Sequence, residues 1–452
     1  MALKRVLSLR TVVATSAGIA LASSSFLAAV QVASYLAGDT AWLAILAGGA
    51  LCFLAAACFS ELNGFLPSAA GVRVYFERTF GERPAITISL LYMGVVTAVL
   101  GAESFVLSHV LSSAVPQVPP LAWLVAMFII IGALNIRGVK FAGNFQDLVT
   151  YALIPSLILM ALLALSKVHF QLEAPLAPGS LGGFVNAMAL GVFLYIGFEW
   201  VTPLAEEVTG IRTISKGMFI ALGILSVTYA LLTVAMTATV SRSALTAAPA
   251  PQMVFAQEAL GPAGAAWMVV LSLAASIKTF NAGLISVSRF VYATAREGLL
   301  PKWFARVSMR YFTPWAAIVA IVLVGVVFSA YVLWAGDGVA KVIVGMAAGV
   351  ECAVYALVGW AVLSLRKKMP DVERPFRVPG GVGIPLATTV VFGLLGAAVL
   401  TSDWRVAGAL AASLLAVVAY VLFIVPPLKK RHLAERQARM ADRPRRRPVQ
   451  GR

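Results

Sequence analysis

Long apolar runs follow one another along most of this chain. An α-helix needs about 20 apolar residues to cross the hydrocarbon core of a bilayer, and it satisfies its own backbone there. The chain is therefore predicted to be an all-α polytopic membrane protein with twelve transmembrane helices. We place them at about residues 11–37, 41–65, 86–111, 120–136, 145–166, 184–204, 216–240, 264–289, 313–335, 341–364, 381–401 and 406–426.

The composition excludes a water-soluble enzyme. Hydrophobic residues make up 60% of the chain and charged residues only 12%, whereas soluble domains contain about 45–50% and about 25%. The three cysteines lie inside apolar runs and the three histidines are scattered. Neither pattern has the spacing of a metal site or a disulfide framework, so we expect no metal and no cofactor.

The basic residues indicate how the chain is oriented. Twelve spans place both termini on one side of the membrane, and 30 of the 35 lysines and arginines fall on that side, with four on the other and Lys278 inside a span. By the positive-inside rule that side is cytoplasmic, which predicts a multi-pass protein of the cytoplasmic (inner) membrane. The net charge of +16 thus reflects orientation and contact with anionic lipid rather than nucleic-acid binding. We expect the basic tail from Lys429 to Arg452 to be disordered.

Two of the predicted spans are interrupted by small residues. SAGIALASSS occupies residues 16–25 in the first span and ALGVFLYIGFE residues 189–199 in the sixth. Because five spans separate their starts, the two segments cross the membrane in opposite directions, as an inverted repeat requires. Glycine costs about 1 kcal/mol in a helix interior, so either the helices break there to expose ligand-binding backbone or they pack closely through small residues.

This pattern predicts five segments along the chain. They are a cytoplasmic N-terminus (1–10), a first five-helix repeat (11–166), a second five-helix repeat (184–364), two further helices (381–426) and a basic cytoplasmic tail (427–452).

Four segments in a fixed order carry a family resemblance. They read FSELNGFLPSAAGVRVYFERTFG (59–81), LNIRGVKFAGNFQD (134–147), YIGFEWVTPLAEEVTGIRTISKG (195–217) and NAGLISVSRFVYATAREGLLPKWFARV (281–307). Together they resemble the amino acid, polyamine and organocation (APC) superfamily of permeases. The resemblance implies a LeuT-like fold, with a 5+5 inverted repeat, broken helices 1 and 6, and two extra helices.

The resemblance also implies a substrate site at the two breaks. In the family, backbone N–H groups of the first break hold the substrate's carboxylate, and carbonyls of both breaks hold its ammonium. This agrees with helix electrostatics, since half-helix N-termini offer donors and C-termini offer acceptors. A bulky aromatic side chain, here Phe193, closes over the substrate. The corresponding substrate-binding residues are Ser16, Ala17, Gly18, Ile19 and Ala20 in the first break and Phe193, Tyr195, Ile196 and Gly197 in the sixth helix.

Lys278 is a candidate for the coupling group. In several proton-coupled relatives a fifth-helix lysine replaces the sodium ion of sodium-coupled ones, but that position here is Leu153. The family's sodium site draws ligands from helices one and eight, and Lys278 lies on the eighth. A lysine in the bilayer centre costs at least about 2.5 kcal/mol. We hypothesise that protonated Lys278 joins helices one and eight and that its deprotonation loosens them. The alternative is a fixed ion pair with Glu199, at similar depth, that serves packing alone.

Three intramembrane carboxylates are further coupling or gating candidates. Glu199 stands at a commonly acidic family position, which favours a gate or a proton role. Glu103 and Glu351 could attract a second cationic group of the substrate. The helical neighbours of Glu103 are all apolar, so its partner must come from another helix, water or substrate, or else it is simply neutral. Glu206 and Glu207, after the sixth span, are either a cytoplasmic gate or a solvated helix end.

The predicted function is secondary active transport of an amino acid or related amine by alternating access, with proton symport. The partners are the small-molecule substrate, protons and membrane lipid. Exchange of two substrates is the rival within this class, and a sensor that binds without transport is a second alternative. An enzyme is not predicted, because the spans contain no grouping of nucleophile and base.

Overall fold

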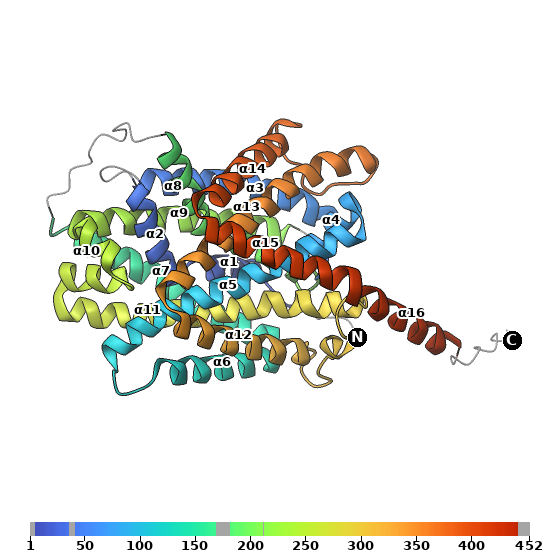
Figure 1. Ribbon diagram of the computed structural model, residues 1–452, viewed down its shortest axis with the longest axis horizontal. Coiled ribbons are helices and arrows are strands. Elements are labelled where there is room, and N and C mark those ends of the chain that lie inside the picture. Colours follow the sequence, from blue (N-terminus) through green and yellow to red (C-terminus); the bar gives the residue numbers. More distant parts are fainter. Residues whose placement is uncertain (1–4, 36–40, 169–180, 211, 442–452) are drawn as a thin grey trace.

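The computed structural model describes residues 5–35, 41–168, 181–210 and 212–441. Helices dominate this part of the chain (Figure 1). In chain order they are α1 (Leu9–Ala20), α2 (Ser24–Tyr35), α3 (Ala41–Phe65), α4 (Val72–Phe80), α5 (Glu82–Ala114), α6 (Pro120–Arg137), α7 (Val139–Leu165), α8 (Leu181–Phe193), η1 (Phe198–Glu206), α9 (Thr213–Thr239), α10 (Arg242–Ala247), α11 (Pro251–Arg296), η2 (Lys302–Ala305), α12 (Trp315–Ala335), α13 (Asp337–Lys368), α14 (Gly383–Ser402), α15 (Trp404–Ala419), η3 (Tyr420–Ile424) and α16 (Val425–Ala441).

The predicted class of fold, an all-α polytopic membrane protein, is confirmed. Ten helices of the described residues are long and apolar enough to cross a membrane, and α1 with α2, bent by 55°, make an eleventh span. The predicted sixth span is built from α8 and η1, two shorter pieces. The count of twelve spans and the inverted relation of the two halves stay predictions.

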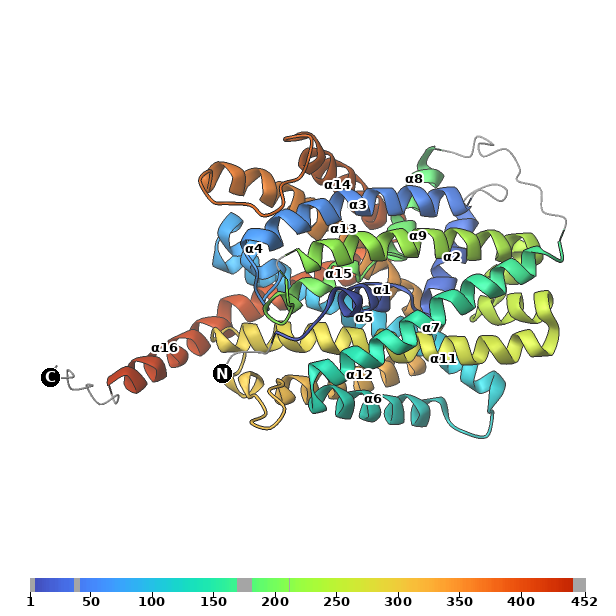
Figure 2. The same cartoon turned by 180° about the vertical axis from the view of Figure 1, so that it is seen from behind.

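The broken first span lies in the middle of the bundle. Figures 1 and 2 show α1 at the centre from both sides, with α3 and α14 along one edge and α6 and α12 along the other. Helix α1 packs against α7, α9, α11 and η1. Its residues from Thr11 to Ala20 are all buried, so the chemistry of the first break is shielded from lipid.

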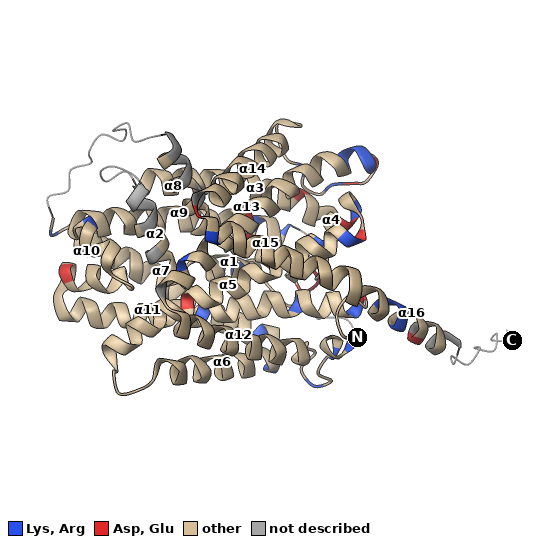
Figure 3. Cartoon of the chain, in the orientation of Figure 1, with Lys and Arg blue, Asp and Glu red and all other residues tan. Residues whose placement is uncertain are grey.

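Charged residues gather at one end of the bundle. Figure 3 shows most blue and red segments at the end where α4 lies and from which α16 extends, while the middle of the helices is largely tan. A central layer with few charges is what a bilayer requires of a spanning protein. The charges that do occur in that layer therefore need specific partners.

The expectation of a disordered tail is wrong for its first part. Residues up to Ala441 form α16, which continues the last span through the π-helical turn η3. The helix is already nucleated by the span before it, and Lys302 forms an ion pair with Glu435. Residues 442–452 lie outside the described part of the chain.

Candidate functional site

The first span breaks immediately after the predicted segment. Ser16 to Ala20 were expected to be unwound, but they form the last turns of α1, and the break comprises Leu21, Ala22 and Ser23. The predicted location of this break is therefore wrong, although a break exists.

The displaced break has a local explanation. A side chain at Gly18 would place its Cβ 2.0 Å from Nε2 of Gln146, so this glycine serves close packing of α1 against α7. The chain breaks instead before a run of serines, whose hydroxyls compete for helical hydrogen bonds. Ser25 Oγ donates to Ala20 O over 2.9 Å, and Ser23 Oγ donates to Ser272 O over 3.0 Å.

Lys278 holds the carbonyl end of α1. Its ammonium donates to Gly18 O over 2.9 Å and also to Leu21 O. Thr279 Oγ1 donates to the same Gly18 oxygen over 3.0 Å. These carbonyls are among those that a helix leaves free at its C-terminus, where the helix dipole favours a cation. The side chain of Lys278 is completely buried.

The alternative ion pair between Lys278 and Glu199 does not form. Both oxygens of Glu199 accept from tyrosines, Oε1 from Tyr92 over 2.7 Å and Oε2 from Tyr355 over 2.8 Å. Equal depth in the membrane did not make the lysine and the carboxylate neighbours, because depth does not determine which way each helix faces.

Glu103 holds the opposite side of the first break. Its two carboxylate oxygens accept from the backbone amides of Ser23, over 2.9 Å, and Ser24, over 2.7 Å. The hydroxyl of Ser276 donates to the same carboxylate. The partners of Glu103 thus come from other helices, as its apolar neighbours required. They lie at the N-terminus of α2, where the helix dipole favours an anion.

The second break lies where the sequence predicts it. Helix α8 ends at Phe193, the next three residues form turns, and Gly197 adopts φ 115° before η1 begins. A Cβ on Gly197 would lie 2.3 Å from Cγ2 of Ile19 and 3.1 Å from the backbone nitrogen of Ala20. The glycine therefore permits both the left-handed conformation and the close approach of the two breaks.

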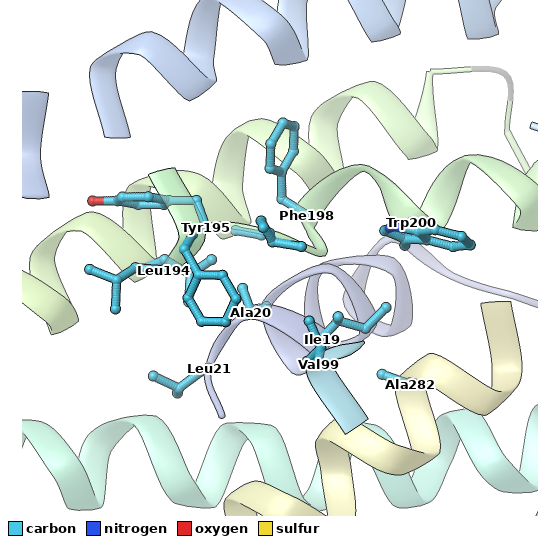
Figure 4. Packing of buried hydrophobic residues seen from close by; sticks show 14 of the residues in the cluster. Ile19, Ala20, Leu21, Val99, Leu194, Tyr195, Phe198, Trp200 and Ala282 are labelled. Atoms are coloured by element: carbon cyan, nitrogen blue, oxygen red, sulfur yellow. The ribbon is translucent and has the colours of Figure 1, made fainter. Parts of the chain in front are cut away.

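The two breaks pack directly against each other. Ser16 Oγ donates to Phe198 O over 2.7 Å. Figure 4 shows Ile19 and Ala20 at the end of α1, and Leu21 of the first break, beside Leu194 and Tyr195 of the second break. The predicted residues Phe193, Tyr195 and Ile196 are all buried there. Their role in binding a substrate stays a prediction.

Two tyrosines flank the breaks in a way that the sequence did not reveal. Tyr229 Oη donates to Ala20 O over 2.6 Å, and Tyr195 Oη donates to Ile45 O over 3.0 Å. Their rings meet edge to face at 5.8 Å. A cavity of about 10 Å³ lined by Tyr229, Ser25 and other residues lies beside them. It holds at most one water, so the site must open before a substrate can enter here.

Two further buried carboxyl groups, those of Glu199 and Glu351, lie near the start of η1. Glu351 lies on α13 one helical turn before Tyr355, whose hydroxyl donates to Glu199. Both side chains are completely buried. No donor among the described residues forms a hydrogen bond to either oxygen of the Glu351 carboxyl group. A buried carboxyl group without a donor is strongly unfavourable as an anion.

Ion pairs close the end of the bundle beyond the breaks. We call them the ion-pair layer. Arg289 Nε and a Glu207 oxygen are 3.0 Å apart with both side chains buried, and Arg296 and Glu206 are 3.2 Å apart. The backbone amides of Val6 and Leu7 also donate to the carbonyl oxygen of Glu207. The buried pair of Glu207 does not fit a solvated helix end, whereas Glu206 is partly exposed, and the role of both residues as a gate stays a prediction. Further pairs join Arg73 to Glu77 and Glu297, Glu61 to Arg366 and Arg374, and Arg10 to Asp147.

Comparison with known proteins gives consistent similarities. The family described as amino acid permease matches residues 7–432. The methylthioribose transporter of Bacillus subtilis (strain 168) is 25% identical over 85% of this chain and 86% of its own length. The cystine/glutamate transporter of Homo sapiens is 23% identical over 85% and 78%, respectively. Among solved structures, a manganese transporter of Eremococcus coleocola aligns with a TM-score of 0.59 at 13% identity, covering 95% of both chains. At that identity the likeness concerns the fold alone.

Proposed function

The chain belongs to the amino acid permease family, and we propose that it carries an amino acid or related amine across the cytoplasmic membrane by proton symport. In this proposal it works by alternating access, with both termini in the cytoplasm. The observation that carries the proposal is Lys278, whose ammonium joins α11 to the broken end of α1. The names of the relatives range from amino acids to methylthioribose, so they leave the substrate open.

The chemistry of Lys278 supports coupling to protons. A protonated amine offers three donors and a full charge to the carbonyl oxygens of Gly18 and Leu21. Loss of the proton removes the charge, and hydrogen bonds between neutral groups are roughly half as strong. Proton release therefore weakens the attachment of α1 to α11. Because α1 carries one of the two breaks, this step changes the substrate site.

The carboxyl pair of Glu199 and Glu351 supports the same proposal from the other side of the second break. A buried carboxyl group without a hydrogen-bond donor is strongly unfavourable as an anion, so Glu351 is suited to carry a proton. Tyr92 and Tyr355 orient Glu199 through their hydroxyls. A proton on this pair and a proton on Lys278 are the two that transport can use.

Proteoliposomes with a defined pH gradient test this function. The substrate is first identified from the change in melting temperature of the purified protein with a panel of amino acids and amines, because a ligand of the folded state raises it. We expect radiolabelled substrate to accumulate only when the lumen is more alkaline than the outside. Accumulation that requires preloaded counter-substrate and no proton gradient would indicate exchange instead. Binding with no flux under either condition would indicate a sensor.

A further inference from the structure

We propose that the site takes a primary amine or similar organic cation with no carboxylate beside its amino group. The inference rests on the proposed function and narrows its substrate class. It follows from Glu103, which occupies the N-terminus of α2 with a carboxylate of the protein itself. Free backbone amides at such a helix end are where a substrate carboxylate would bind.

Each backbone amide from Ala22 to Phe26 already has an acceptor within the chain. The amides of Ser23 and Ser24 donate to the two oxygens of Glu103. Those of Ala22, Ser25 and Phe26 donate to carbonyl oxygens of the break itself over 2.9 to 3.2 Å. A carboxylate arriving at this helix end finds no free amide donor, and it meets the negative charge of Glu103 instead.

Glu103 is held in this position by three hydrogen-bond donors. Its side chain is completely buried, and the neighbours one turn away on α5 are apolar. The Ser276 hydroxyl gives its carboxylate a third donor. Moving a buried carboxylate from three donors into apolar surroundings leaves its charge unpaired, which is strongly unfavourable. A substrate carboxylate is therefore a poor competitor for the same amides.

The charge balance around the breaks favours a cation. Outside the ion-pair layer, the fully buried charged side chains of the described residues include three carboxyl groups, of Glu103, Glu199 and Glu351, and one ammonium, of Lys278. That ammonium is committed to carbonyl oxygens of α1. Even with Glu351 protonated, the two other carboxylates outnumber the one ammonium, so an incoming ammonium group meets an excess of negative charge, which attracts it.

Unused acceptors lie at the same place. The hydroxyls of Ser24 and Ser272 are buried and have no hydrogen-bond partner among the described residues. Both are close to Glu103, since Ser24 donates its amide to Glu103 and Ser276 bonds to both Glu103 and Ser272 O. Hydroxyl oxygens accept hydrogen bonds from an ammonium group. Two unpaired hydroxyl oxygens and the carboxylate of Glu103 therefore lie near a helix end whose backbone amides all have acceptors.

Uptake of matched pairs into proteoliposomes tests the inference. Each pair is an amino acid and the amine left by its decarboxylation: leucine and isoamylamine, phenylalanine and phenethylamine, arginine and agmatine, ornithine and putrescine. For the wild type we expect uptake of the amine in at least one pair to exceed that of its amino acid by about tenfold or more, as expected for a lost charged hydrogen bond. Glu103→Gln, which removes the charge, should reduce this preference by about tenfold.

The control is Glu258→Gln, because Glu258 is exposed near the start of α11; it should keep the wild-type preference. If Glu103→Gln does not fold, the inference is tested on the wild type instead. The amine of a matched pair should raise the melting temperature of the wild type, and the amino acid of that pair should not. Wild-type transport of amino acids as good as that of their amines in every pair, or an unchanged preference in Glu103→Gln, would overturn this inference and leave the transport function intact. Transport of none of the eight compounds would overturn the proposed function as well.

Discussion

The two helix breaks touch each other, yet the chain treats them differently. At the first break, Lys278 occupies the carbonyl end and Glu103 the amide end, so both helix dipoles are matched by charges of the protein. At the second break, Gly197 allows the turn, and the nearest acid along the chain, Glu199, bonds to tyrosines instead. The first break is thus an electrostatic site, and the second is a joint shaped by close packing. Four experiments test this division.

The largest effect is expected at the packed joint. In Gly197→Ala the new methyl group would lie 2.3 Å from Ile19 Cγ2 in a backbone conformation that disfavours side chains. Strain and overpacking together amount to about 3 kcal/mol, or roughly 100-fold in uptake. Uptake and membrane abundance should be measured together. The control is Gly223→Ala, because a Cβ there meets nothing within 4 Å. Equal uptake by the two variants would show that the second break is not a tight joint.

The next effect separates charge from packing at the first break. Lys278→Met keeps the length of the side chain and removes its charged hydrogen bonds to Gly18 and Leu21. We expect accumulation under a proton gradient to fall roughly 10- to 100-fold, and the remaining uptake to lose its dependence on pH. Lys167→Met is the matched control, since Lys167 also donates to a carbonyl oxygen, that of Ala259, but is exposed. A pH profile shaped like that of the wild type would refute proton coupling through Lys278.

A smaller effect compares one hydroxyl at each break. Tyr229→Phe removes the bond to Ala20 O at the first break, and Tyr195→Phe removes the bond of the second break to Ile45 O. A buried hydrogen bond contributes about 1 kcal/mol, which corresponds to about fivefold. If the first break is the binding element, as we propose, Tyr229→Phe should lower affinity in a binding titration and Tyr195→Phe should not. The reverse order would mean that the second break is the binding element.

The smallest effect concerns the bond between the breaks. Ser16→Ala removes the hydrogen bond to Phe198 O, which ties the last turns of α1 to the start of η1. The expected loss in free energy of unfolding is about 1 kcal/mol, measurable as a lower melting temperature in detergent. Ser113→Ala serves as the control, because its hydroxyl bonds only within α5. A melting temperature unchanged by Ser16→Ala would mean that this bond adds nothing to the joint.

The class of fold and the second break could be predicted from the sequence, whereas the first break lies later in the chain than predicted. Hydrophobic length determines spans, and Gly197 stands where the chain turns. Gly18 also suggested a break, but a glycine stands there because α1 packs closely against Gln146. The serine run that follows marks the actual break, but serine is also common where helices pack in membranes.

The partners of the buried charges could not be predicted. Lys278 and Gly18 are 260 residues apart, and Glu103 and Ser23 are 80 apart. Sequence position gives the depth of a residue in the membrane but not the rotation of its helix. Depth alone suggested Glu199 as the partner of Lys278, and the tyrosines that hold Glu199 have no sequence signal that distinguishes them from packing residues.

The attachment of the chain's first described residues to the ion-pair layer has a practical consequence. The amides of Val6 and Leu7 bond to the Glu207 carbonyl, and Leu7 pairs with Val208 like a strand. In the proposed transport cycle this end of the bundle opens, and these bonds must then break or move together with the segment after η1. A fluorophore attached just before Val6 would therefore report each opening in real time, at a distance from the two breaks.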